Sequence, residues 1–87
     1  MLKFPAVLTH AQADPCLTQW LSQLPLGTGA VVVDGAELKE FDSTALALLL
    51  ELRRHLQGRG QTLLLEATPP RLRELATLYG VDELLAI

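Results

Sequence analysis

Few side chains in this sequence could act as a nucleophile or as an acid–base group, and they are scattered. The chain holds one cysteine, Cys16, and two histidines, His10 and His55. A cysteine paired with a histidine could form a nucleophile and its base, but the histidines fall in different predicted elements and neither is close to Cys16 in the sequence. We therefore interpret Cys16 as a small packing residue and His55 as a solvated residue on a helix. The sequence predicts no catalytic residue.

Metal, cofactor and phosphate sites have equally little support. One cysteine excludes an internal disulfide and a metal site built from several thiolates. Gly58-Arg59-Gly60 has the glycines of a phosphate-binding loop, but no helix follows it, so we interpret it as a helix-to-strand turn. Asp34 and Asp42 could form a carboxylate pair, although a loop carboxylate more often caps a turn or a helix. We predict no metal and no cofactor.

The segment Asp42-Ser43-Thr44 is more informative, because it precedes the strongest predicted helix of the chain. Asp42 and Ser43 are both good N-caps. The start of a helix also carries partial positive charge and free N–H groups, so the same position can accept a phosphate or an anionic group of a partner. Capping and partner binding are compatible, and the sequence alone leaves both open.

Three predicted strands and three predicted helices alternate along the chain and position these residues. The strands lie near residues 3–8, 30–34 and 61–66, and the helices near 14–24, 43–57 and 70–79. This order predicts an α/β fold, a small sandwich with a mainly parallel or mixed sheet, and one domain over residues 1–87. Binding sites in such sheets lie beyond the carboxyl ends of the strands. That edge would hold Asp34, the loop of residues 35–42, Ser43 and residues 66–68.

Local signals refine several of these elements. Asp14 is a candidate cap of the first helix, and Pro15 suits its first turn. Pro5 weakens the first strand and favours an edge position for it. Ala30–Val33 is predicted to form a strand buried on both faces, because polar and apolar residues do not alternate in it. Thr62–Leu65 is predicted to form a second strand of this kind.

The helix near residues 43–57 is apolar over more of its circumference than one sheet can cover. Its apolar residues span roughly 200°, whereas packing one face on a sheet needs about 100°. Neighbouring helices could cover the surplus, or another protein could bind it. We predict that the partner-binding residues lie at the start of this helix and on the flank of its apolar arc: Asp42, Ser43, Thr44, Ala45 and Leu48.

The composition is that of one small folded domain. Of the 87 residues, 49% are hydrophobic and 20% are charged, which excludes intrinsic disorder. The net charge is −3 and no basic cluster exceeds Arg53-Arg54, so we exclude a non-specific nucleic-acid binder. The longest apolar run, Ala45–Leu50, is far too short for a membrane span, and the N-terminal run is too short for a secretory signal. The expected location is the cytoplasm.

Two segments of the sequence resemble the STAS domain family. Val31–Asp34, followed after a loop by Asp42–Leu46, is similar to the family's buried strand ending in Asp and its D-S-[ST]-[GA]-L motif. Pro70–Val81 is similar to the family's final helix and closing glycine turn. The resemblance covers roughly residues 28–87. It implies a STAS-like α/β fold and a non-enzymatic interaction module.

Two branches of this family imply different partners. In anti-sigma factor antagonists, a serine kinase phosphorylates the serine that corresponds to Ser43, and the other partner is an anti-sigma factor. In the MlaB branch, the domain is the cytoplasmic subunit that binds the ATPase, an MlaF-like protein, of a phospholipid ABC transporter for outer-membrane lipid asymmetry. Ala45–Leu52 and Leu75–Tyr79 resemble the MlaB branch more closely. The resemblance therefore implies an ATPase-binding module that meets the membrane only through its transporter, with the antagonist as the alternative and a homodimer as a further option.

The N-terminus departs from the family pattern. STAS domains usually begin with a β-hairpin whose second strand runs into a G-x-[LI]-D segment. Here one strand alone is predicted before the first helix, and Thr9–Ala13 holds neither the glycine nor the aspartate. A missing hairpin strand would leave one edge of the sheet less covered.

Overall fold

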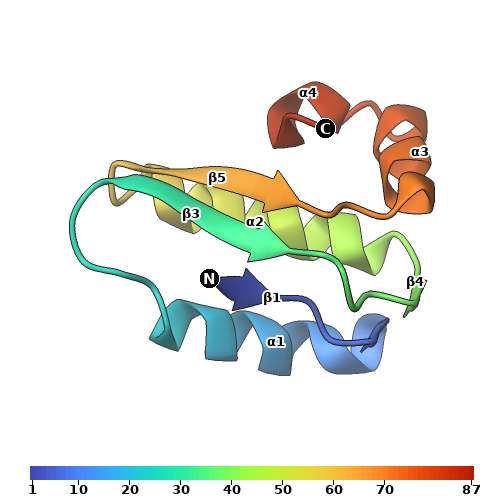
Figure 1. Cartoon of the computed structure of the whole chain (residues 1–87), viewed down its shortest axis with the longest axis horizontal. Coiled ribbons are helices and arrows are strands. Elements are labelled where there is room, and N and C mark those ends of the chain that lie inside the picture. Colours follow the sequence, from blue (N-terminus) through green and yellow to red (C-terminus); the bar gives the residue numbers. More distant parts are fainter.

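The computed structural model describes residues 1–87 and has the predicted alternation of strands and helices. Figure 1 shows the whole chain. The elements are β1 (Leu2–Lys3), β2 (Val7–Leu8), α1 (His10–Ser22), β3 (Gly29–Asp34), β4 (Glu40–Phe41), α2 (Thr44–Gln57), β5 (Gln61–Glu66), α3 (Pro70–Leu78) and α4 (Asp82–Leu85). The predicted α/β class is confirmed, with parallel sheets packed against helices.

The main sheet has three parallel strands in the order β1-β3-β5. β3 and β5 pair residue for residue, from Gly29 opposite Gln61 to Asp34 opposite Glu66. β1 adds only two residues, which pair with Val33 and Asp34 at the carboxyl end of β3. A separate two-stranded sheet, β2 with β4, also has parallel pairing.

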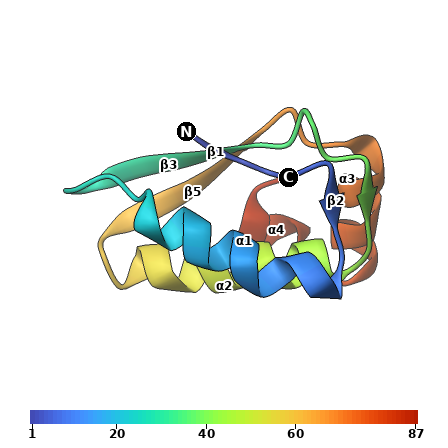
Figure 2. The same cartoon turned by 90° about the horizontal axis from the view of Figure 1, so that it is seen from below.

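The helices α1 and α2 cover one face of the main sheet, and the opposite face is open, as Figure 2 shows. Val31 and Val33 point to the helices and are buried, whereas Ala30 and Thr62 are exposed and Leu64 is 46% exposed. The prediction that residues 30–33 and 62–65 are buried on both faces is therefore wrong. Successive side chains of a strand point to opposite faces, so with one helical layer only alternate residues are covered.

The predicted strand at residues 3–8 is in fact two short strands in different sheets. Pro5, which lacks a backbone N–H, separates β1 from β2. β2 pairs with β4, in a segment that the sequence predicted as loop, and the N–H groups of Lys39 and Glu40 both donate to the carbonyl of Ala6 (2.8 and 2.9 Å). This connection carries the chain from the sheet edge to α1.

The first helix begins at His10, four residues before the predicted start. Thr9 and Gln12 form a capping box, in which the side-chain oxygen of Gln12 accepts a hydrogen bond from the N–H of Thr9 (2.9 Å). Asp14 is therefore not the cap. Pro15 lies inside the helix, where it removes one helical N–H, rather than in the first turn.

The core lies between the helical layer and the covered face of the sheet. α2 supplies six buried residues, and its neighbours are β5, α1, α3 and the short α4, which the sequence did not predict. These elements surround α2 on several sides, so its wide apolar arc is covered within the chain. None of the helices has the length and hydrophobicity that a membrane span requires. The α2 residues in the core are Ala45, Leu46, Leu48, Leu49, Leu52 and Leu56.

Candidate functional site

The polar segment before α2 caps the helix through Asp42 and leaves the Ser43 side chain free. A carboxylate oxygen of Asp42 accepts a hydrogen bond from the N–H of Thr44 at 2.8 Å. Ser43 occupies the N-cap position, but its side chain makes no capping hydrogen bond and is exposed. Its carbonyl accepts the first helical hydrogen bonds, from the N–H groups of Leu46 and Ala47 (both 3.1 Å). The Ser43 hydroxyl is therefore available to a partner at the positive end of a helix.

The pKa of Asp42 lies below its usual value. The main cause is hydrogen bonding from Thr44, first from its side chain and then from its backbone N–H, and the charge of His10 adds to it. Hydrogen bonds to the charged form of a carboxyl group favour that form. Asp42 is therefore ionised at neutral pH, and a carboxylate stands beside the free hydroxyl of Ser43.

This capping interaction predicts a pH-dependent contribution to stability. Because the pKa of Asp42 is lower in the folded chain, its contribution is present above the unfolded value of about 3.9 and is lost as pH falls through the folded pKa. We expect Asp42→Ala to melt below the native chain at pH 7 and to approach it in acid. Thermal melts from pH 7 to pH 3 test this, with Ser43→Ala as a control that keeps the Asp42–Thr44 contact. A difference in melting temperature between Asp42→Ala and the native chain that does not change with pH would contradict this prediction.

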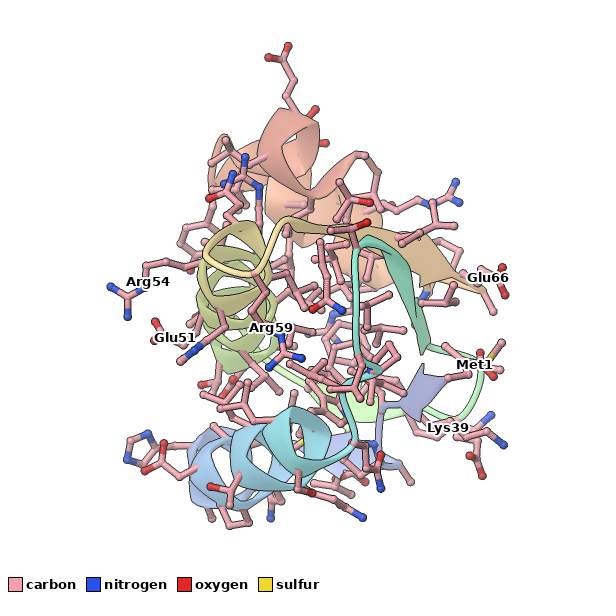
Figure 3. The ribbon with its side chains drawn as sticks, turned by 90° about the vertical axis from the view of Figure 1, so that its left-hand side faces the viewer. Met1, Lys39, Glu51, Arg54, Arg59 and Glu66 are labelled. Carbon is pink, nitrogen blue, oxygen red and sulfur yellow. The ribbon has the colours of Figure 1, made fainter.

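A shallow groove runs between α1 and α2 beside this segment. It has a volume of about 140 Å³, an apolar floor from both helices and a carboxylate on each helix. On α2, Glu51 is paired with Arg54 and lies 3.5 Å from His55 Nε2; Figure 3 shows Glu51 and Arg54 together on the outer side of α2. The groove is lined by Ala13, Asp14, Leu17, Thr44, Ala47, Leu48 and Glu51.

The structure brings only part of the predicted partner-binding set to the surface. Asp42 and Ser43 are exposed, and Thr44 is half-buried in the wall of the groove. Leu48 is 4% exposed and reaches the groove floor, whereas Ala45 is 0% exposed and does not line the groove. The expectation that Ala45 and Leu48 lie beside the core is therefore wrong. Packing of α1 against α2 covers this side of the helix.

The groove also includes residues that the sequence did not single out. Ala13 and Leu17 come from α1, and Ala47 is an exposed residue between two buried positions of α2. The α1 residues lie one turn apart, a spacing that places them on one face of a helix. The sequence predicts that this helix begins near residue 14, which leaves Ala13 outside it. The helix face shared by Ala13 and Leu17 is therefore not apparent from the sequence.

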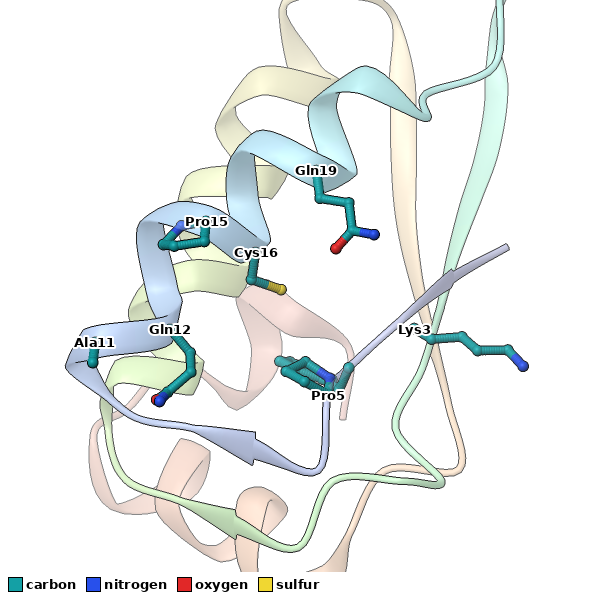
Figure 4. A pocket seen from close by; sticks show the side chains of 8 residues that line it. Lys3, Pro5, Ala11, Gln12, Pro15, Cys16 and Gln19 are labelled. Atoms are coloured by element: carbon teal, nitrogen blue, oxygen red, sulfur yellow. The ribbon is translucent and has the colours of Figure 1, made fainter.

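The remaining chemistry-bearing residues have structural roles. Asp34 accepts a hydrogen bond from the N–H of Ala36 (2.9 Å) and so closes a turn. This local role is similar to that of Asp42, which caps a helix. Burial raises the pKa of the Cys16 thiol to about 11, which keeps it protonated at neutral pH and makes it a poor nucleophile. Figure 4 shows Cys16 on α1 directed toward the segment around Pro5, where a hollow of about 370 Å³ lies. No group of three or more His, Cys, Asp or Glu side chains could hold a metal ion.

Comparison with known proteins identifies the family. A search of curated proteins finds no match. The family model described as "Mlab, STAS domain" matches residues 2–86, nearly the whole chain, including the N-terminal segment that departs from the usual hairpin. This match confirms the STAS resemblance, and the family consists of interaction modules that are generally non-catalytic. The chain belongs to the MlaB-type STAS domain family.

Proposed function

We propose that this chain is a non-enzymatic subunit that binds the ATPase of an ABC transporter for phospholipids, on the cytoplasmic side of the membrane. The observation that carries the proposal is the exposed Ser43 hydroxyl, which Asp42 leaves free by capping α2 in its place. The MlaB-type family supports the choice of partner. In this role the chain meets the membrane only through the transporter.

The binding surface that we propose combines the start of α2 with the α1–α2 groove. Ser43 offers a small hydroxyl at the positive end of α2, and the groove beside it offers an apolar floor for one side chain of the ATPase. Such a surface joins a central apolar contact to a polar rim, as protein interfaces commonly do. Ala47, exposed on the groove floor, has no bulk that would keep a partner side chain away.

The alternative is an anti-sigma factor antagonist that a serine kinase controls. It is supported by the exposure of Ser43, because a kinase needs an accessible hydroxyl. The MlaB-type family match favours the ATPase instead. Incubation with a serine kinase and ATP, followed by measurement of the intact mass, separates the two: addition of one phosphate would support the antagonist.

We expect Ser43→Asp to weaken binding of the purified chain to an MlaF-like ATPase by about tenfold or more, a loss of about 1.4 kcal/mol. The substitution adds charge and bulk at a closely fitted hydroxyl, yet Asp is as good an N-cap as Ser, so the fold should keep its melting temperature. Calorimetric titration of the ATPase measures the effect. Ser43→Ala, which adds neither charge nor bulk, is the control and should bind within a few-fold of the native chain.

Ala47→Arg tests the groove separately, because a long cationic side chain would fill it. Gln57→Arg is the matched control, an exposed position at the far end of the same helix. We expect Ala47→Arg to reduce ATPase binding as strongly as Ser43→Asp and Gln57→Arg to leave it unchanged. Native-like binding by both Ser43→Asp and Ala47→Arg would place the ATPase on another surface. A native chain that binds no MlaF-like ATPase would remove the proposed partner.

A further inference from the structure

Arg53 of α2 is the only cationic side chain of the structure that is half-buried. The other six lysine and arginine residues are exposed. Arg53 follows Leu49 by four residues and precedes Leu56 by three, so it shares a side of the helix with two leucines that are 0% exposed. A charge that is partly withdrawn from water is stabilised by an opposite charge or by hydrogen bonds. Arg53 is therefore a position at which an anion is expected.

The chain itself supplies no anion to Arg53. Both ion pairs of the structure use Glu51, which pairs with Arg54 and His55, and the arginine side chains that donate hydrogen bonds are Arg54 and Arg59. The α2 residues three and four positions from Arg53 are all uncharged, so no carboxylate meets it at helical spacing. No side-chain nitrogen or oxygen is buried without a hydrogen-bond partner. The unpaired guanidinium of Arg53 is therefore accessible to a ligand.

Arg53 lines a hollow of about 200 Å³ between α2, β5 and α4. Figure 1 shows α4 on the side of β5 that faces away from β3, and the two elements are in contact. Leu84 of α4 is 50% exposed and gives the hollow an apolar wall. Arg53 is the only charged residue among those that line it: Arg53, Gln57, Gln61, Thr62, Leu63 and Leu84.

The backbone of Leu63 has unpaired groups at this hollow. The N–H of Gly35 donates to the carbonyl of Glu66 (2.9 Å), so the backbone groups of Glu66 face β3. The direction alternates along a strand, so the N–H and C=O of Leu63 face away from β3. β5 has no strand on that side, and no other backbone hydrogen bond involves Leu63. An extended backbone can therefore bond to Leu63 from within the hollow.

We propose that the hollow between α2, β5 and α4 binds an extended acidic segment of a partner polypeptide, with a glutamate or aspartate side chain of that segment paired to Arg53. Pairs of arginine with a carboxylate are among the strong charge-assisted hydrogen bonds. A free phosphate ion would use Arg53 alone, whereas an extended acidic segment also uses the backbone of Leu63 and the apolar side chain of Leu84. The hollow shares no residue with the α1–α2 groove, and the proposal does not depend on the proposed ATPase.

The test is a titration of the isotope-labelled full chain with the peptide acetyl-Thr-Val-Glu-Val-Thr-amide, followed by NMR. We expect shifts of the Leu63 amide signal and of the Arg53 Nε–H signal, and slower hydrogen exchange at Leu63. The same peptide with glutamine in place of glutamate keeps the shape and loses the charge. It should bind about tenfold more weakly, the effect of one hydrogen bond between charged groups. Inorganic phosphate alone should leave the Leu63 amide signal unchanged.

Variants of two adjacent arginines test the ion pair from the side of the chain. Arg53→Gln should weaken binding of the glutamate peptide by about tenfold. Arg54→Gln is the matched control, because Arg54 is exposed and already paired with Glu51, and it should bind like the native chain. Arg53→Glu reverses the charge and should bind acetyl-Thr-Val-Lys-Val-Thr-amide more tightly than the native chain does.

Four results would overturn the proposal. They are equal binding of the glutamate and glutamine peptides, signal shifts that map away from α2 and β5, an equal loss for Arg53→Gln and Arg54→Gln, and a shift of the Leu63 amide by phosphate as large as that by the peptide. The comparison of the two peptides uses the native chain, so it decides the question even if the Arg53 variants do not fold.

Discussion

Leu49→Ala is expected to lower the free energy of unfolding by about 2–5 kcal/mol, the range for removing a buried leucine side chain. Leu49 is 0% exposed, and α2 has neighbours on several sides that would have to collapse into the space left behind. Alanine is itself a strong helix former, so the loss would come from the cavity and not from the helix. A domain of this size has a total stability of about 4–13 kcal/mol, so the change is large. Urea denaturation measures it.

Leu48→Ser gives this prediction its comparison. The sequence pattern predicts that Leu48 lies on the flank of the apolar arc, with cover by a neighbouring helix as the alternative to cover by a partner. Because Leu48 is 4% exposed, we now expect a loss of about 1.5–3 kcal/mol, the contribution of a buried aliphatic side chain. The loss should be smaller than that of Leu49→Ala, since Leu48 borders the groove, where a serine hydroxyl can reach water.

The order of the two losses decides how much of α2 is internal. Ala47→Ser, at an exposed position of the same helix, is the control and should change stability by less than about 0.5 kcal/mol. An unchanged unfolding midpoint for Leu48→Ser would mean that its side chain contributes little to the core and is free for a partner. A loss as large as that of Leu49→Ala would mean that it is wholly part of the core. In either case, Ala47 is the better residue with which to test partner binding, because its replacement does not disturb the core.

The order of the main elements could be predicted because it depends on local patterns. The helix predicted near residues 43–57 is α2, Thr44–Gln57, and the strand predicted at 61–66 is β5. In both cases a glycine or a polar capping residue lies where the spacing of the apolar residues changes, so the local signals agree. The sequence also predicts a cap at the start of this helix, but it leaves Asp42 and Ser43 as equal candidates.

Other features depend on which elements meet in space. The run Ala30–Val33 contains no polar residue that would mark an uncovered face, so its sequence could not show that one helical layer is absent. The start of α1 was placed too late because Asp14-Pro15 is a stronger local signal than the Thr9–Gln12 capping box that the chain uses. The groove could not be predicted at all, since it needs residues of α1 and α2 whose separation in sequence carries no information about their packing.

Trp20→Ala is expected to lower the free energy of unfolding by about 3–5 kcal/mol, the largest loss among the changes considered. Trp20 is 2% exposed and holds the N-terminal segment against α1 by two contacts. Its ring meets that of Phe4 edge to face, with centroids 5.1 Å apart, and its Nε1–H donates to the carbonyl of Lys3 at 3.1 Å. Removal of the indole leaves both a cavity and a carbonyl without its donor.

The effect of Trp20→Ala should be greatest at β1, because this two-residue strand has few other attachments. Its pairing with β3 involves Val33 and Asp34 alone, and the next hydrogen bond is that of the Phe4 N–H. We expect hydrogen exchange at Phe4 to become faster than at Val31, which stays paired with β5. Trp20→Phe keeps an aromatic ring and loses only the indole donor, so it should cost about 1 kcal/mol. Equal acceleration at Phe4 and Val31 would show that the sheet opens as one unit and that Trp20 does not hold β1 separately.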